Sequence, residues 1–225
     1  MARDIYRRVP RLIADFPHFL SVFLDNPPFN RAGQLEYHVD TIQLRRELGS
    51  VSKALSDDGF LQSLYRTLQA WGIGARASYL APFEVFANRL QTKADEIAGL
   101  EETRIDDKDI NVGEVARKLW NTLDNLEIVT NNATIVPGTK ALHHLLPDLV
   151  VPIDRAYTQK FFGWHNPEFQ YGQPDVFRRS FKAFVEIARA IDLNRYVGSG
   201  WCSSRTKIID NAIVGMLREE KEANE

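Results

Sequence analysis

The sequence predicts an all-α protein, and three observations lead to this prediction. Apolar residues recur at helical spacing through most of the 225-residue chain. Alternating runs rich in Val, Ile and Thr, the usual pattern of β-strands, are nearly absent. Asp, Asn and Ser stand where several apolar stripes begin, as helix caps do. We expect one compact helical domain over residues 1–225, and the sequence leaves open a division into two lobes, about 1–105 and 106–225, with a cleft between them.

Nine helices are predicted in order along the chain, at about 11–23, 34–48, 59–71, 83–98, 112–126, 139–146, 155–162, 174–190 and 205–217. The Asn26-Pro27-Pro28 turn follows the first, and Pro147-Asp148 follows the sixth. Helix caps are expected at Asp57 and Asp58, at Asn111, and at Ser203 and Ser204. The helix at 174–190 carries a stripe of Val, Phe and Ile residues, which indicates a place in the core.

Composition excludes several classes of protein. With 44% hydrophobic residues the chain can bury a core, so intrinsic disorder is excluded. The single cysteine, Cys202, cannot form an internal disulfide, hold an iron–sulfur cluster or make a cysteine zinc site. Charges or prolines interrupt each apolar stretch well before the ~20 residues that a membrane span needs. The N-terminus has no apolar signal core. We expect a cytoplasmic monomer without cofactor, metal or membrane contact.

Charge is unevenly distributed along the chain, although the net charge is only −2. Seven acidic residues lie between residues 95 and 109, which predicts a solvated connection and a seam between lobes. Residues 193–209 contain Arg195, Arg205 and Lys207 but no acid. The small net charge therefore does not exclude a nucleic-acid partner.

Residues 134–163 carry the most informative motif. Pro137-Gly138 predicts a tight turn, and a helix beginning at Thr139 would present free amide donors to an anion, with Lys140 beside them. An extended segment then leads to Asp154 at the start of the next helix, where backbone amides would keep its carboxylate ionised.

This arrangement, over residues 137–163, resembles the helix-hairpin-helix (HhH-GPD-like) signature of the DNA glycosylase superfamily. The resemblance implies a hairpin at Pro137-Gly138-Thr139-Lys140 that grips DNA phosphate, and Asp154 as the catalytic aspartate. Lys140 takes the position of the nucleophile in bifunctional members. The sequence has one glycine before Lys140 where the family usually has two, and a Lys-to-Asp separation of 14 residues that is shorter than usual.

The implied activity is excision of a damaged or modified base from DNA, which leaves an abasic site. Asp154 would stabilise the positive charge that develops on the sugar. Arg155, Arg205 and Lys207 join Gly138 and Thr139 as expected DNA contacts. A flipped base also needs stacking faces and polar groups, and the candidates for this base pocket are Trp71, Arg76, Tyr79, His143, His144 and Trp164.

Structural roles compete with each of these assignments. Asp154 can be only a helix cap, Lys140 a solvated residue or phosphate contact, and Trp71 a core residue. At least one of His143 and His144 is expected to be structural, and Trp201 and Cys202 to seat the last helix. The alternatives to a glycosylase are a non-catalytic nucleic-acid-binding helical module and a helical interaction protein. Oxidised purines, alkylated bases and hypermodified cytosine are all compatible substrates, in DNA repair or, for the last, in antiviral defence against phages.

Overall fold

The computed structural model describes residues 5–29, 31–74, 78–131 and 133–223. Helices account for most of these residues, and no β-strand occurs among them, so the all-α prediction is confirmed. Extended pairing within the described ranges is limited to an isolated antiparallel bridge between Leu80 and Val129. None of the helices in these ranges is long and apolar enough to cross a bilayer.

The first predicted helix is two helices, α1 (Ile5–Ala14) and α2 (Phe16–Asp25). Pro17 lies in the first turn of α2, where its missing amide hydrogen costs nothing, whereas the same residue inside a continuous helix would break the hydrogen-bond ladder. The prediction of one continuous helix over 11–23 is therefore wrong, because the helix is interrupted at Asp15.

Five helices follow, namely α3 (Gln34–Leu48), α4 (Val51–Ser56), α5 (Asp58–Ala70), α6 (Phe83–Thr92) and α7 (Ala94–Ala98). The predicted bounds of α3 are confirmed, and Asp57 caps α5 by accepting from the Phe60 amide at 2.7 Å. The helix predicted over 83–98 is interrupted at Lys93, and α4 was not predicted.

The second half of the chain contains α8 (Val112–Asp124), α9 (Ile135–Leu145), α10 (Thr158–Phe161), α11 (Asn166–Tyr171), α12 (Gln173–Ala190), the 3₁₀ turns η1 (Leu193–Arg195) and η2 (Gly200–Cys202), and α13 (Arg205–Glu222). Asn111 caps α8 and Ser204 caps α13, as predicted. The sequence did not predict α11.

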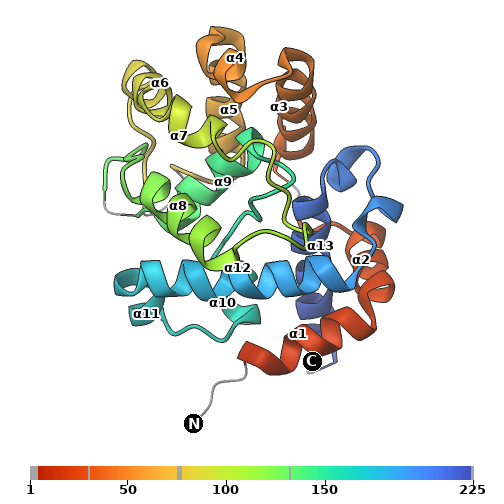
Figure 1. The fold of residues 1–225 in the computed structure, drawn as a ribbon. Coiled ribbons are helices and arrows are strands. Elements are labelled where there is room, and N and C mark those ends of the chain that lie inside the picture. The colour runs from red at the N-terminus through yellow and green to blue at the C-terminus, as the bar shows by residue number, and fades with distance from the viewer. Residues whose placement is uncertain (1–4, 30, 75–77, 132, 224–225) are drawn as a thin grey trace.

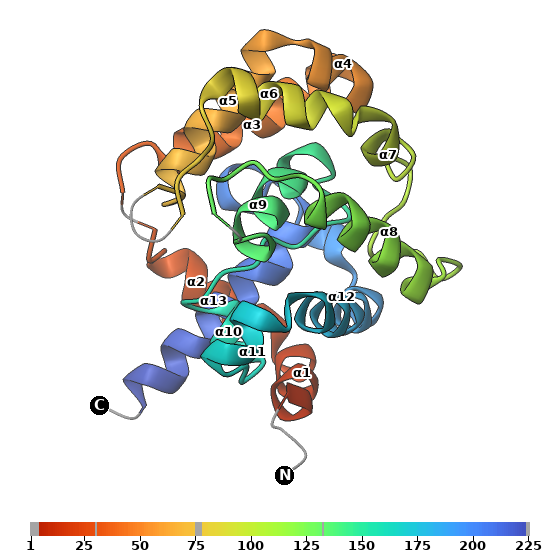
Figure 2. The same ribbon diagram turned by 90° about the vertical axis from the view of Figure 1, so that its left-hand side faces the viewer.

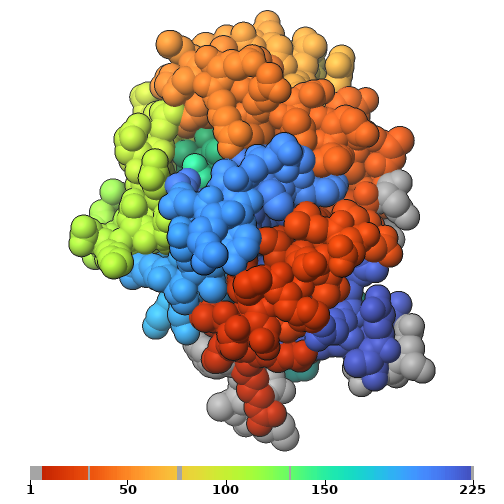
Figure 3. Space-filling view, turned by 90° about the vertical axis from the view of Figure 1, so that its right-hand side faces the viewer, coloured from red at the N-terminus to blue at the C-terminus, as the bar shows by residue number. Residues whose placement is uncertain are grey.

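The two ends of the chain pack together. Helix α2 lies along α13, and at Gly215 the two helices are so close that an added Cβ would overlap the Phe19 carbonyl oxygen. Figure 3 shows the N-terminal helices against the C-terminal segment on one face of the molecule. Segments from both sides of residue 105 thus share one body of packed helices, and the division into lobes near that residue remains a prediction.

Helix α9 runs through the centre of the molecule (Figure 1). Figure 2 shows α3 to α7 on one side of it and α2, α10, α11 and α13 on the other. Its residues Ala141, Leu142 and Leu145 are fully buried in the main core. The chain then turns at Pro147 and continues without helix through Ile153 to Asp154.

The tight turn predicted at Pro137-Gly138 is wrong, because both residues lie inside α9. Pro137 occupies the first turn of the helix, where an amide hydrogen is not required. Gly138 is buried, its amide donates to the Thr134 carbonyl at 3.0 Å, and an added Cβ would lie 2.6 Å from Leu123 Cδ2. The glycine serves close helix packing, and its amide does not face a ligand.

Candidate active site

A pocket that is partly open to solvent lies where residues far apart in the sequence meet. Its cavity volume of about 40 Å³ is room for a few water molecules, and it is well below the ~300–1,000 Å³ of sites that enclose a small molecule. Its apolar walls are three aromatic side chains, those of Phe29, Trp71 and Trp201. Four charged side chains also line it, those of Lys140, Asp154, Lys207 and Asp210, and Gln34 and Pro152 complete the lining. We call this set the aromatic pocket.

Asp154 reaches the aromatic pocket from the end of the extended segment. Its Oδ1 accepts hydrogen bonds from the amides of Tyr157 and Thr158, at 2.7 and 3.1 Å. These bonds confirm that backbone amides hold the carboxylate, but the helix predicted over 155–162 begins only at Thr158, so Asp154 caps the turn that precedes α10. Within the described part of the chain, Oδ2 accepts no hydrogen bond, so one oxygen is fixed while the other is available to a ligand.

Lys140 enters the same pocket from α9. Its Nζ donates to the Trp71 carbonyl at 2.9 Å and lies 5.8 Å from the centre of the Trp71 ring. Burial lowers the pKa of Lys140, while the negative charge of Asp154 raises it. The two residues that the glycosylase resemblance assigns to catalysis therefore line one pocket and influence each other electrostatically.

Lys207 and Asp210 form the floor of the aromatic pocket on the first turns of α13. Lys207 is 1% exposed and donates to Asp210 Oδ2 at 2.5 Å and to Asn211 Oδ1 at 2.9 Å. Its ammonium lies 4.8 Å from the ring centre of Phe29 and 4.9 Å from that of Trp201. Burial raises the pKa of Asp210, and the Lys207 charge opposes that rise. Lys207 is thus a buried pocket residue paired with Asp210, which corrects its prediction as a DNA contact.

The other predicted DNA contacts lie elsewhere. Thr139 is fully buried, where its hydroxyl donates to the Ile135 carbonyl and accepts from the Ile153 amide, so with Gly138 it is unavailable to phosphate. Arg205 pairs with Asp148 at 3.1 Å and Asp106 at 3.5 Å, and its side chain is 12% exposed. Arg155 is exposed, with its guanidinium 5.6 Å from the centre of the Phe169 ring.

Among the predicted base-pocket residues, Trp71 lines the aromatic pocket. Tyr79 is 59% exposed and Trp164 is buried beside Arg179, and neither lines it. Arg76 lies outside the described residues. His143 and His144 are fully buried behind the pocket wall, which corrects their assignment to the pocket itself.

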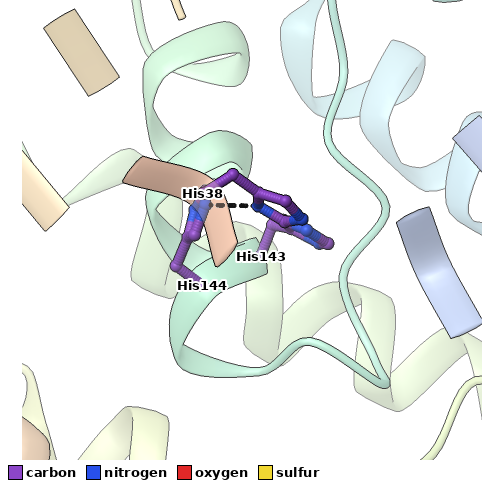
Figure 4. A group of neighbouring side chains, drawn as sticks. All are labelled: His38, His143 and His144. Carbon is purple, nitrogen blue, oxygen red and sulfur yellow. Dashed lines mark hydrogen bonds between the residues drawn. The ribbon is translucent and has the colours of Figure 1, made fainter. Parts of the chain in front are cut away.

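The two histidines meet a third, His38 of α3, in the interior (Figure 4). His38 Nδ1 lies 3.0 Å from His144 Nε2, and its Nε2 lies 2.7 Å from Ser203 Oγ. Burial lowers the pKa of all three imidazoles, that of His144 to about 4, so each ring is neutral at pH 7. We call these residues the histidine cluster.

Sequence reasoning missed Phe29, Gln34, His38 and Asp210, and gave Trp201 only a structural role. Asp210 carried a usable signal, because Lys207 and Asp210 have the i,i+3 spacing of an ion pair on a helix. No sequence signal marks the other three residues, Phe29, Gln34 and His38. They reach the pocket or its wall only because α2 and α3 pack against α9 and α13.

Together the fold and the pocket define an all-helical protein with an aromatic site that contains two lysines and two aspartates. Comparison with protein-family models, curated proteins and solved structures gave no match for this chain.

Proposed function

We propose that the protein is a DNA glycosylase that excises a damaged or modified base and leaves an abasic site. The observation that carries the proposal is that Asp154 and Lys140 line one pocket with three aromatic faces. The aromatic side chains suit a base that has left the duplex, because stacking holds any base while polar groups read its edge. The proposal requires the pocket walls to move apart when the base enters, because the cavity of about 40 Å³ is smaller than a base.

In the proposed reaction, water forms a bond to the sugar C1′ while the N-glycosidic bond breaks. The base leaves with the bonding electron pair and takes up a proton, and the attacking water loses one. Positive charge develops on the sugar, and the fixed carboxylate of Asp154 stabilises it. Because two amides hold Oδ1, the carboxylate needs no reorganisation during the step.

Lys140 has a supporting role in this scheme. Its ammonium, together with that of Lys207 in the same pocket, offers positive charge to the departing base. The lowered pKa of Lys140 also suits an amine that attacks sugar carbon, as in a bifunctional enzyme. We favour the monofunctional reaction, in which borohydride traps no covalent adduct with DNA. DNA is the proposed partner of a cytoplasmic monomer.

The test is incubation with a panel of DNA that contains oxidised purines, alkylated bases and hypermodified cytosine, including phage DNA. Released base and abasic sites are measured for the wild type and for Asp154→Asn, which keeps an oxygen for the two amides. We expect release by the wild type and a loss of about 10²–10³-fold in the variant. Asp175→Asn, at the exposed start of α12, is the matched control and should retain full activity.

Absence of release across the panel would contradict the glycosylase proposal. Unchanged release by Asp154→Asn would leave the activity standing and exclude the proposed role of the carboxylate. A covalent adduct after borohydride, lost in Lys140→Gln, would replace the monofunctional scheme with the bifunctional one.

A further inference from the structure

The histidine cluster has a feature that its hydrogen bonds do not explain. His143 Nε2 is completely buried and has no hydrogen-bond partner. A buried unpaired nitrogen costs about 1–3 kcal/mol in desolvation, so such an atom calls for a partner. One nitrogen of each of the three rings lies within 4.8 Å of the other two.

The outer nitrogens of two rings are already held by backbone carbonyls. His143 Nδ1 lies 3.0 Å from the Val150 carbonyl oxygen, and His144 Nδ1 lies 2.8 Å from the Lys140 carbonyl oxygen. Because a carbonyl only accepts, each Nδ1 carries the proton and each Nε2 carries a lone pair. Metal-bound histidines in proteins are oriented in this way, with the second nitrogen donating to a carbonyl.

His38 can complete the set through Nδ1. Without a ligand, its Nδ1–H donates to His144 Nε2 and its Nε2 accepts from the Ser203 hydroxyl. If His38 exchanges to the other tautomer, Nε2–H donates to Ser203 Oγ and Nδ1 presents a lone pair beside that of His144. The exchange moves one proton between two nitrogens of one ring, and the cluster neither gains nor loses protons.

We propose that the histidine cluster binds a divalent transition-metal ion of the zinc type through His38 Nδ1, His143 Nε2 and His144 Nε2. Imidazole nitrogen is the ligand that zinc, nickel and copper ions share, and three histidines with a water molecule form a four-coordinate zinc site. Two nitrogens on one zinc ion lie roughly 3.4 Å apart, given bonds of about 2.0–2.1 Å. The 3.0 Å separation of His38 Nδ1 and His144 Nε2 is close to this value.

The site would connect α3 to α9 directly behind the aromatic pocket. The His38 ring lies 5.2 Å from that of Trp71 and 5.7 Å from that of Trp201, both of which line the pocket. A bound ion would therefore fix two pocket walls without contacting a ligand inside the pocket. Lys207 is the opposing influence, because its positive charge disfavours added positive charge on His38 and His143. The inference does not depend on the proposed glycosylase activity.

The experiment uses the full chain, freed of any histidine tag and of metal, and titrated with Co²⁺ and then with Zn²⁺. We expect one equivalent of Co²⁺ to give the visible bands of a four-coordinate ion, Zn²⁺ to displace it, and Zn²⁺ to raise the midpoint of thermal unfolding. In ¹⁵N spectra of the imidazoles, Nε2 of His143 and His144 should shift when Zn²⁺ is added. Absence of these changes in the wild type would overturn the proposal.

Variants separate the cluster from accidental surface binding. His143→Gln should abolish the saturable Co²⁺ spectrum, and Ser203→Ala, which removes only the partner of His38 Nε2, should weaken binding about 10–100-fold. His18→Gln, at an exposed histidine paired with Glu219, is the control and should bind as the wild type does. Undiminished binding by folded His143→Gln would overturn the proposal. If that variant does not fold, the wild-type ¹⁵N shifts decide.

Discussion

The two ends of residues 137–154 were both predicted to be helix starts that take part in the site. In the structure one end is buried in the core and the other end lines the pocket. At the beginning, Gly138 and Thr139 are buried and bonded within the protein. At the end, Asp154 caps a turn with one carboxylate oxygen and lines the aromatic pocket. Thr139 joins the two regions, because its hydroxyl accepts from the Ile153 amide.

The difference shows that helix-terminus chemistry alone does not make a site. Free amides bind an anion only where the helix begins at the surface, and α9 begins four residues before Thr139. A capping carboxylate is different, because one oxygen satisfies the cap while the second remains free for chemistry. The predictions below test whether the buried region only supports the fold and the pocket region carries the activity.

The largest expected effect is a loss of stability of the metal-free protein in acid. The folded-state pKa of His144 is about 4, and those of His38 and His143 are lowered well below 6.5, whereas unfolded histidine has a pKa of about 6.5. Below pH 6.5 the unfolded chain takes up protons that the folded chain does not. Unfolding free energy should therefore fall between pH 7.5 and 5, by roughly 2 kcal/mol for His144 and by a further amount for His38 and His143.

Urea unfolding of metal-free protein at pH 7.5, 6 and 5 measures this effect. Asp210 acts in the opposite direction, because its folded-state pKa is raised and it binds a proton more readily when folded. His38→Gln removes one of the three titrating rings and should reduce the pH slope. Equal stability at pH 7.5 and 5 would show that the cluster is not buried in its neutral form.

The next effect concerns the connection between the two regions. Thr139→Val keeps the shape of the side chain but leaves the Ile153 amide without its acceptor, which should cost about 1–3 kcal/mol of stability. Thr139→Ser keeps the hydroxyl and should recover most of this stability. The remaining difference from the wild type should be the contribution of the one methyl group that serine lacks. Thermal and urea unfolding measure both. If Thr139→Val were as stable as the wild type, the hydroxyl would not connect α9 to the Asp154 segment.

Most of the fold could be predicted because helix periodicity and caps are local signals. The bounds of α3 and the caps at Asp57, Asn111 and Ser204 required only neighbouring residues. The errors occurred where packing decides. Pro137 and Gly138 form a turn in many contexts, but here they lie inside α9, where Gly138 leaves room for the Leu123 side chain.

The site could be predicted only in part, for the same reason. Asp154, Lys140 and Trp71 carry local motifs or aromatic character, and all three line the pocket. Lys207 was selected as a cation, but its burial among aromatic rings follows from the packing of α2 on α13. His38 joins the histidine cluster from a helix about a hundred residues away from α9, which no local pattern reveals.

The smallest expected effect comes from Gly138→Ala. The new methyl group would lie 2.6 Å from Leu123 Cδ2, so that side chain must move, and overpacking of this kind costs about 1–3 kcal/mol. Alanine recovers up to about 1 kcal/mol as the better helix former. We expect a net loss of about 1 kcal/mol in urea unfolding, with DNA affinity unchanged, because the methyl group faces the core.

Gly113→Ala is the matched control for this substitution. Gly113 also lies in the first turns of a helix, but an added Cβ there meets only Asn111 Oδ1 at 3.6 Å, an ordinary contact distance. That variant should gain a few tenths of a kcal/mol, up to about 1, from helix propensity alone. If Gly138→Ala instead weakened DNA binding while leaving stability unchanged, the result would show that Gly138 contacts a DNA phosphate. The beginning of α9 would then belong to the site along with Asp154.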